Sequence, residues 1–170
     1  MKKGKALNPQ VLIVMGSDSD IPVMEESEKI LGMFNIPYKR TIASAHRSPE
    51  RAIRIAAEAE KKGVEVLIAG AGMAAHLAGI LAAHTILPVI GVPVDAMPLK
   101  GLDALLSTAQ MPPGVPVATM AIGRAGAKNA AILAVQIIAR KDRGVAKRLK
   151  NFKKQMSREV DKKAAALESS

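Results

Sequence analysis

The chain has 170 residues and no cysteine, which excludes disulfides, thiolate metal sites and cysteine nucleophiles. Its three aromatic side chains are too few to form a stacking platform for nucleic-acid bases. The net charge of +10 gathers at the C-terminus, because residues 1–139 carry a net charge of +3 and residues 140–170 carry +7. We therefore expect one domain over residues 1–170 and no nucleic-acid partner.

The chain shows no signal peptide, since the basic segment Met1–Lys5 is followed by Asn8-Pro9-Gln10. One long stretch without charge lies between Glu65 and Asp95, but prolines and glycines interrupt it. A spanning helix needs about 20 uninterrupted apolar residues, so we expect no membrane association and a cytoplasmic location.

Short apolar runs alternate with segments of helical period. The run at residues 11–15 predicts a buried strand, and Pro22 opens a helix. A second strand is expected at about Tyr38–Ala43. The sequence Ser48-Pro49-Glu50 then predicts a helix start with a hydroxyl N-cap, and that helix ends at Gly63.

The same alternation continues to residue 140. Strands are expected at about 64–69, 88–92 and 117–122, and helices at about 73–85, 101–108 and 127–140. Strands that are apolar on both faces, with helices between them, are typical of a parallel sheet covered on both sides. The predicted fold class is α/β, a three-layer α/β/α sandwich with a doubly wound parallel sheet.

An amphipathic basic helix is predicted at about 143–165, outside the core at 11–140. Apolar residues recur on one stripe of it, at Val145, Leu149, Phe152, Met156 and Val160. The simpler interpretation is a basic solvated face above an apolar stripe. The alternative is that the stripe packs on a neighbouring subunit.

Three polar or glycine-rich loops follow predicted strands, and the carboxyl ends of parallel strands meet at one edge of a sheet. They are Gly16-Ser17-Asp18-Ser19-Asp20, Ser44-Ala45-His46-Arg47 and Gly70-Ala71-Gly72. Their backbone N–H groups, the hydroxyls of Ser17 and Ser19 and the guanidinium of Arg47 would suit a phosphate. Asp20 would suit ribose hydroxyls, and helix capping is the structural alternative for Ser19 and Asp20.

His46 is the candidate proton carrier, because it ends a strand beside this anion site. His76 begins an apolar helix and could equally be a core histidine, whereas His84 is expected to be structural. The spacing of the three histidines, without a carboxylate cluster, predicts no metal site. The first loop matches neither a Walker loop nor a dinucleotide fingerprint, so neither ATP nor NAD is expected.

Several strips resemble the PurE-type N5-carboxyaminoimidazole ribonucleotide mutases of purine biosynthesis. They read Val14-Met15-Gly16-Ser17-Asp18-Ser19-Asp20, Ser44-Ala45-His46-Arg47-Ser48-Pro49 and Ala69-Gly70-Ala71-Gly72-Met73-Ala74-Ala75-His76-Leu77, with further matches at 87–94, 110–117 and 129–131. The resemblance implies a flavodoxin-like fold, a ribonucleotide substrate, no cofactor or metal, and a homo-octamer in which the C-terminal helix contacts a neighbour.

The resemblance also implies the roles of the site residues. His46 would protonate the carbamate nitrogen as CO₂ leaves and would later remove the proton from ring carbon C4; His76 is the second catalytic match. Ser17, Ser19 and Arg47 would hold the phosphate and Asp20 the ribose. The other implied substrate contacts are Gly16, Ser44, Ala45, Gly70, Ala71, Gly72, Ala75 and Leu77.

Three departures from the family's pattern fall near the site. Met73 stands where the family has glycine, Ala78 where it has proline, and Asp95–Pro98 differs from the small polar residues usual there. A side chain at Met73 would narrow the pocket or alter the backbone angle. Two other functions remain open: a carboxylase acting on the same nucleotide or a related ring, and a non-catalytic phosphate-binding module of flavodoxin topology.

Overall fold

The computed structural model describes residues 8–96 and 98–169, so the expectations for Met1–Lys5 and for Met97 lie outside the described residues. Within these ranges five parallel strands form one sheet in the order β2-β1-β3-β4-β5. The strands are β1 (Val11–Met15), β2 (Tyr38–Ile42), β3 (Val66–Gly72), β4 (Val89–Val94) and β5 (Ala118–Thr119). The predicted doubly wound α/β fold is confirmed.

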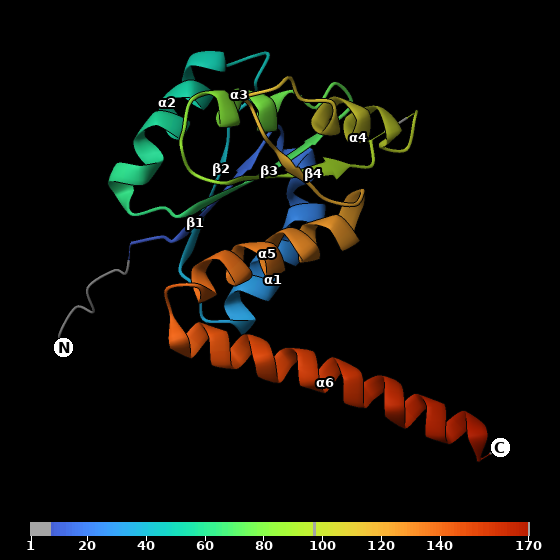
Figure 1. Cartoon of the computed structure of the whole chain (residues 1–170). Coiled ribbons are helices and arrows are strands. Elements are labelled where there is room, and N and C mark those ends of the chain that lie inside the picture. Colours follow the sequence, from blue (N-terminus) through green and yellow to red (C-terminus); the bar gives the residue numbers. More distant parts are fainter. Residues whose placement is uncertain (1–7, 97, 170) are drawn as a thin grey trace, which may run out of the picture.

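Helices cover both faces of this sheet (Figure 1). The helices α2 (Pro49–Ala59), α3 (Leu77–Ala83) and α4 (Leu102–Ala109) lie on one face. The helices α1 (Ile21–Met33) and α5 (Gly123–Ala139) lie on the other, and α6 (Arg143–Glu168) crosses beneath them. Two 3₁₀ turns, η1 (Asp18–Asp20) and η2 (Glu60–Lys62), precede α1 and follow α2.

Two predicted elements are shorter in the structure. The helix expected from residue 73 begins only at Leu77, because the backbone of Met73 is left-handed, with a φ of 55°. The strand expected at 117–122 has two residues, since β5 pairs only through Ala118 and Thr119 at the sheet edge. The chain then turns into α5 four residues earlier than predicted.

The predicted N-cap of α2 is correct in position and wrong in chemistry. Ser48 is the N-cap residue, but its hydroxyl makes no bond to the helix. Instead it accepts a hydrogen bond from the N–H of Ser44 and donates to the carbonyl of Ser44, at 3.1 and 3.2 Å. Ser48 therefore fixes the loop after β2 rather than the first turn of α2.

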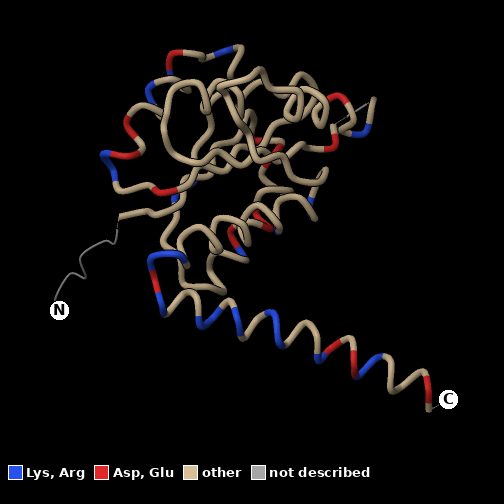
Figure 2. The backbone as a smooth tube through the Cα atoms, viewed as in Figure 1, with Lys and Arg blue, Asp and Glu red and all other residues tan. Residues whose placement is uncertain are grey.

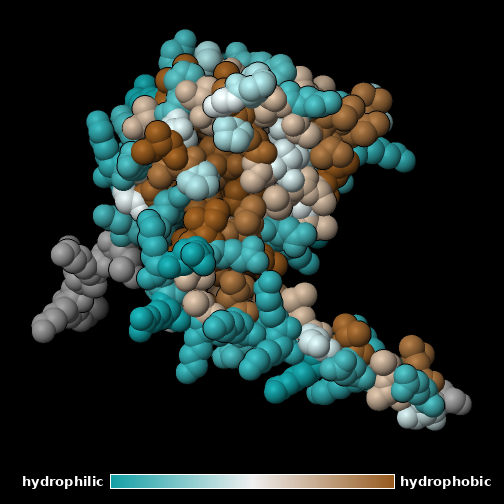
Figure 3. Space-filling view, viewed as in Figure 1, coloured by the Kyte–Doolittle hydropathy of each residue, from teal (hydrophilic) through white to brown (hydrophobic). Residues whose placement is uncertain are grey.

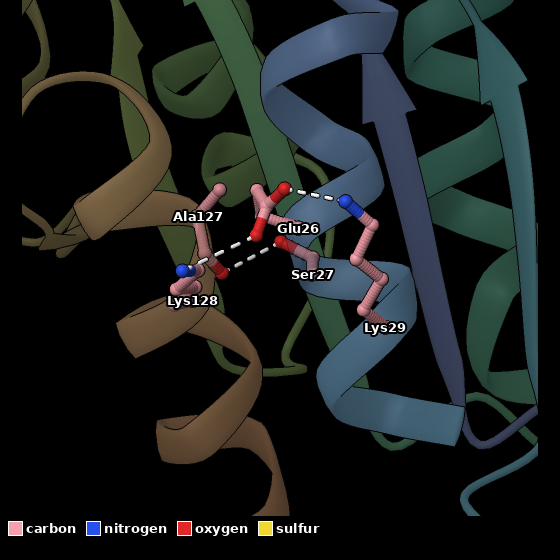
Figure 4. Close-up of polar contacts among 5 residues, drawn as sticks. All are labelled: Glu26, Ser27, Lys29, Ala127 and Lys128. Carbon is pink, nitrogen blue, oxygen red and sulfur yellow. Dashed lines mark hydrogen bonds and ion pairs between the residues drawn. The ribbon is translucent and has the colours of Figure 1, made fainter. Parts of the chain in front are cut away.

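A buried carboxylate and a buried hydroxyl join α1 to α5 (Figure 4). Glu26 contacts Lys29 at 2.6 Å and Lys128 at 3.4 Å, and Ser27 donates a 2.7 Å hydrogen bond to the carbonyl of Ala127. The carboxylate of Glu26 and the carbonyl of Ala127 both lie in an otherwise apolar helix interface, where each polar group needs a hydrogen-bond partner. These bonds fix how α1 and α5 lie against each other under the sheet.

The C-terminal helix is anchored at its start and then leaves the body. Asp142 caps it through a 3.0 Å bond from the N–H of Val145, and the ring of Phe152 packs edge-on against Phe34 at 5.4 Å. Beyond Phe152 every described residue is exposed. The helix ends at Glu168, three residues past the prediction, and carries lysine and arginine along its length (Figure 2).

Apolar side chains remain uncovered at several places on the surface (Figure 3), two of which lie on helices. One is the outer part of α6, where Met156, Val160 and Leu167 are exposed; the other is the outer face of α4. In the part of the chain that the structure describes, no helix combines the length and apolar character that crossing a membrane requires.

Glu26 should give the fold a measurable acid sensitivity. The hydrogen bond from Lys29, together with Lys128, holds the pKa of Glu26 below its usual value. A lowered carboxyl pKa stabilises the fold above the unfolded pKa of about 4.3, and this contribution is lost as the pH falls through the folded pKa. We expect Glu26→Gln to lower the free energy of unfolding at pH 7, with a difference from wild type that shrinks towards pH 3.

Denaturant unfolding at several pH values measures this difference. Glu25→Gln removes a carboxylate from the exposed face of the same helix and serves as the matched control. If the free energies of unfolding of wild type and Glu26→Gln differed by the same amount at every pH, the lowered pKa of Glu26 could not be the source of the difference.

Candidate active site

The register of the sheet brings three strand ends together. Met15 at the end of β1 pairs with Ile42 of β2 on one side and with Gly70 of β3 on the other. The bonds continue one residue further, from the N–H of Gly16 to the carbonyl of Gly70 and from the N–H of Ala43 to the carbonyl of Met15. The loops after β1 and β2 therefore start side by side, and β3 continues beside them for two more residues to Gly72 before its own loop begins.

The loop after β1 closes on itself through a capping box. The N–H of Ser17 donates to Oδ2 of Asp20 at 2.9 Å, and the N–H of Ser19 donates to the hydroxyl of Ser17 at 3.3 Å. Asp20 is buried, Ser17 is half-buried and Ser19 is exposed. The capping alternative is thus correct for Asp20, but its second oxygen Oδ1 is given no partner by these bonds.

The pKa values of the two carboxylates in this loop shift in opposite directions, one because of burial and the other because of hydrogen bonding. Burial raises the pKa of Asp20 above its usual value, against the lowering effect of the N–H groups of Ser17 and Gly16. The hydroxyl of Ser17 lowers the pKa of the exposed Asp18. Asp20 is therefore a carboxylate that the fold keeps largely out of water beside an open cavity.

The loop after β2 holds the predicted Ser44-Ala45-His46-Arg47 strip. The hydroxyl of Ser44 accepts a 3.1 Å hydrogen bond from the N–H of Arg47, a side-chain-closed turn that serine favours. This turn leaves the side chains of His46 and Arg47 exposed at the sheet edge. The guanidinium of Arg47 also lowers the pKa of Asp18, which places it across from the first loop.

The loop after β3 makes an abrupt turn at Met73. A left-handed backbone costs a residue other than glycine about 1–2 kcal/mol, yet Met73 adopts it with a φ of 55°. The N–H of His76 then bonds the carbonyl of Ala74 at 2.9 Å, and His76 becomes the N-cap residue of α3. The turn therefore delivers His76 to the site.

The two histidines that the sequence separates by 30 residues meet directly. Nε2 of His46 lies 2.7 Å from Nδ1 of His76, and the ring centroids are 4.8 Å apart with the planes at 72°. At this distance one of the facing nitrogens carries a hydrogen and the other accepts it. The geometry thus joins the two rings by one hydrogen bond, whose donor depends on the tautomers of the two histidines.

These three loops enclose a cavity of about 460 Å³. Of the predicted site residues, those lining it are Gly16, Ser17, Ser19, Asp20, Ser44, Ala45, His46, Arg47, Ala71, Gly72, His76 and Leu77. Gly70 and Ala75 are not among the lining residues. Gly70 lies behind the cavity against Met24, whose Sδ would be 2.5 Å from an added Cβ, and Ala75 is buried.

Three further lining residues are Met73, Ala74 and Ala96; of these, Met73 and Ala96 lie at the departures that the sequence placed near the site, and Ala74 was not predicted. The first two follow the glycine loop directly. Ala96 lies two residues beyond β4, so the rule that parallel strands deliver residues to one edge would have found it.

His84 lies apart from the pair, and its Nδ1 contacts the carbonyl of Ile80 at 2.9 Å within α3. It is not a lining residue of the cavity. Over residues 8–96 and 98–169, no three histidine, aspartate or glutamate side chains gather closely enough to hold a metal ion.

Known proteins resemble this chain over nearly its whole length. A protein from Pyrococcus horikoshii called N5-carboxyaminoimidazole ribonucleotide mutase is 55% identical over 164 residues, which are 96% of this chain and 92% of that protein. The Escherichia coli protein of the same name is 49% identical, covering 90% of this chain and 91% of its own. A Candida glabrata phosphoribosylaminoimidazole carboxylase is 50% identical over 95% of this chain, which spans only 28% of that protein.

The solved structures agree on the fold. The crystal structure of Treponema denticola PurE superposes with a TM-score of 0.85 at 28% identity and covers 94% of this chain and 98% of that one. The model of the AIR carboxylase family matches residues 10–159, which include all three loops and the start of the outer part of α6. The chain belongs to the AIR carboxylase family.

Proposed function

We propose that this protein is an N5-carboxyaminoimidazole ribonucleotide mutase, which moves a carboxyl group from the exocyclic nitrogen of the substrate to ring carbon C4. The observation that carries the proposal is the His46–His76 pair, 2.7 Å apart, in a cavity that also presents anion-binding loops. Relatives that bear this name at 49–55% identity support it over 90% or more of the chain.

The polar side of the cavity suits the ribose phosphate. Ser19 offers an exposed hydroxyl and Arg47 an exposed guanidinium, whose planar fork matches phosphate oxygens. Ser17 would turn its half-buried hydroxyl from Asp18, to which it donates at 2.9 Å, towards the phosphate. Asp20 would accept hydrogen bonds from ribose hydroxyls through its carboxylate. Backbone around Ser44, Ala45, Ala71 and Gly72 would border the ring, with Gly16 and Leu77 beneath it and Gly70 and Ala75 supporting the loop from behind.

His46 would move one proton in each direction. In its protonated form it gives a proton to the exocyclic nitrogen while the nitrogen–carbon bond of the carbamate breaks, which releases CO₂ and the neutral amine. Carbon C4 of the electron-rich ring then attacks the CO₂, forming the new carbon–carbon bond. His46 removes the hydrogen from C4, so the ring regains aromaticity and the histidine ends as it began.

His76 would hold His46 in place throughout these steps. When both nitrogens of His46 carry hydrogens, Nε2–H can donate to Nδ1 of a neutral His76. When Nδ1 of His46 gives up its proton to the substrate, the same contact persists. The reacting proton therefore moves at Nδ1 while the ring orientation stays fixed, without a metal or an organic cofactor.

A carboxylase that joins free CO₂ to aminoimidazole ribonucleotide is the second candidate. It is favoured by the Candida glabrata relative, which is named for that reaction at 50% identity. Both reactions share the second half of the mechanism above, and they differ in whether the CO₂ comes from the substrate or from solution. The experiment below distinguishes the two.

The decisive test incubates the purified protein with substrate carrying a ¹³C-labelled carbamate and follows the label by carbon NMR. Label that appears on C4 supports the mutase, whereas product formed only from unlabelled aminoimidazole ribonucleotide and bicarbonate identifies a carboxylase. We expect His46→Asn to lower turnover by about 10²–10⁴-fold, the usual contribution of a general acid–base, while nucleotide binding is retained.

His84→Asn is the matched control, because His84 is not a lining residue of the cavity and its ring contacts the carbonyl of Ile80 in its own helix. It should keep wild-type turnover. Unchanged turnover in a folded His46→Asn variant would overturn the proposed proton carrier.

Asp20→Asn should separate stability from binding. The amide keeps an acceptor for the N–H of Ser17 but removes a charge that the fold must desolvate, so the variant should be as stable as wild type or more stable at pH 7. Because the pKa of Asp20 is raised, this gain should shrink as the pH falls through it. Ribonucleotide affinity should drop about ten- to a hundredfold, the value of hydrogen bonds to a charged group.

Thermal unfolding over a pH series and titration calorimetry measure the two effects. Asp18→Asn is the control, since Asp18 is exposed and the pKa of its carboxyl is lowered rather than raised. Undiminished affinity in Asp20→Asn would rule out the ribose role.

We further propose that the protein is a single-domain subunit of a cytoplasmic homo-octamer. The residues of α6 beyond Phe152 project roughly 24 Å from the body at 1.5 Å per residue and carry exposed Met156, Val160 and Leu167. Helices in proteins gain most of their stability from packing an apolar face against other structure. The apolar residues on one face of this projecting segment therefore favour a protein partner. The phosphorylated substrate does not cross a bilayer unaided, which favours the cytoplasm.

Changes on the two faces of α6 test this assembly. Met156→Gln with Val160→Gln removes the apolar stripe and should reduce the mass measured by light scattering. Lys154→Gln with Arg158→Gln alters the opposite face of the same turns and should leave the octamer intact. Identical masses for the two double variants would contradict a role for the stripe.

A further inference from the structure

Asp18 is a carboxylate of the loop after β1 that the proposed site does not use. It is exposed and does not line the cavity, although its neighbours Ser17 and Ser19 do. A carboxylate beside a phosphate site acts against the ligand, because two negative charges repel each other. Asp18 therefore has a place next to the site but no role in binding an anion directly.

The carboxylate of Asp18 is bonded to groups that would hold the phosphate. Its Oδ1 accepts a 2.9 Å hydrogen bond from the hydroxyl of Ser17 and a 3.1 Å hydrogen bond from the N–H of Ser19. The hydroxyl of Ser17 lowers the pKa of Asp18 most, and the charge of Arg47 lowers it further. In the free protein an internal anion therefore draws on the two donors and the cation that face a bound phosphate.

The bond to Asp18 also sets the direction of the Ser17 hydroxyl. A serine hydroxyl has one hydrogen to donate, and here that hydrogen goes to Asp18. Because the pKa of Asp18 lies below its usual value, the carboxylate is charged at neutral pH and remains a strong acceptor. A phosphate can gain this donor only if Asp18 loses it.

We infer that Asp18 competes with the phosphate of the ribonucleotide for these groups and so lowers the affinity of the site for phosphorylated ligands; this inference rests on the proposed function. The phosphate takes no part in the carboxyl transfer, so substrate and product carry it unchanged and Asp18 weakens both alike. An effect common to substrate and transition state changes KM and leaves the chemical step as it is. Weaker binding of the product also lets it leave faster.

The loop does not need the charge of Asp18 to keep its shape. The N–H of Ser17 bonds Asp20 and the N–H of Ser19 bonds the hydroxyl of Ser17, so the capping box closes without Asp18. In addition, asparagine keeps an acceptor oxygen in place of Oδ1. Asp18→Asn therefore removes the negative charge while the hydrogen bonds of the turn are retained.

The test measures the affinity of wild type and Asp18→Asn for aminoimidazole ribonucleotide by titration calorimetry. We expect the variant to bind about three- to tenfold more tightly, the effect of one unit charge near an anion in a water-exposed setting. This change is opposite in direction to the one expected for Asp20→Asn. The ratio of the two affinities should approach one in about 1 M potassium chloride, where exposed charges are screened.

Two further measurements assign the effect to the phosphate. The corresponding nucleoside lacks the phosphate, so it should compete against the ribonucleotide equally weakly in both proteins once the ribonucleotide affinity of each is taken into account. In turnover of the carbamate substrate, KM of Asp18→Asn should fall by the same factor as the dissociation constant, while kcat does not rise.

Glu50→Gln is the matched control, since Glu50 is an exposed carboxylate in the first turn of α2 and does not line the cavity. It should bind the ribonucleotide as wild type does. Equal or weaker binding by Asp18→Asn, or a gain that the nucleoside shares, would overturn the inference and leave the proposed function standing. A wild type that binds the ribonucleotide without converting the carbamate would overturn the proposed function alone, and failure to bind it would overturn both.

Discussion

The alignment of three strand ends is the constraint on which the rest of the site depends. Met15 lies in register with Ile42, the last residue of β2, and with Gly70, two residues before the end of β3, so the loops that follow reach the same edge of the sheet. A slip of β3 by one residue would put a side chain where Gly70 now lies, and a Cβ there would meet Met24 at 2.5 Å. The buried packing of α1 under β3 therefore fixes the position of the loop that carries His76.

Much of this arrangement could be predicted from the sequence, because it depends on local patterns. The apolar pentapeptide at 11–15, the proline at 22 and the glycines at 70 and 72 mark where strands end and helices begin. These signals suffice to place His46 and the Gly16–Asp20 loop at one edge of a parallel sheet. The apolar stripe on α6 could also be predicted from the helical period, but its packing on the body through Val145, Leu149 and Phe152 was not expected.

The features that could not be predicted from the sequence depend on the backbone conformation of single residues rather than on the pattern of apolar and polar residues. The string of alanines after Met73 reads as continuous helix, and only the left-handed backbone at Met73 delays the start of α3 to Leu77. The contact of His46 with His76 needs that delay, because it places His76 at the N-cap instead of inside the helix. Likewise, Ser48 serves the loop and not the helix, a choice between two partners of similar energy that the sequence does not settle.

Two residues of the cavity have features that the free protein would be more stable without. Asp20 is a carboxylate whose burial disfavours its charge, and Met73 has a strained backbone with an apolar side chain left in water. Both line the same cavity, whereas elsewhere the fold satisfies its buried carboxylate, Glu26, with two lysines. Residues in one cavity that each lower the stability of the free protein indicate selection for binding a ligand rather than for stability. A nucleotide with a polar ribose phosphate and a flat carboxylated ring would satisfy Asp20 and cover Met73 at once, so binding itself would compensate for both.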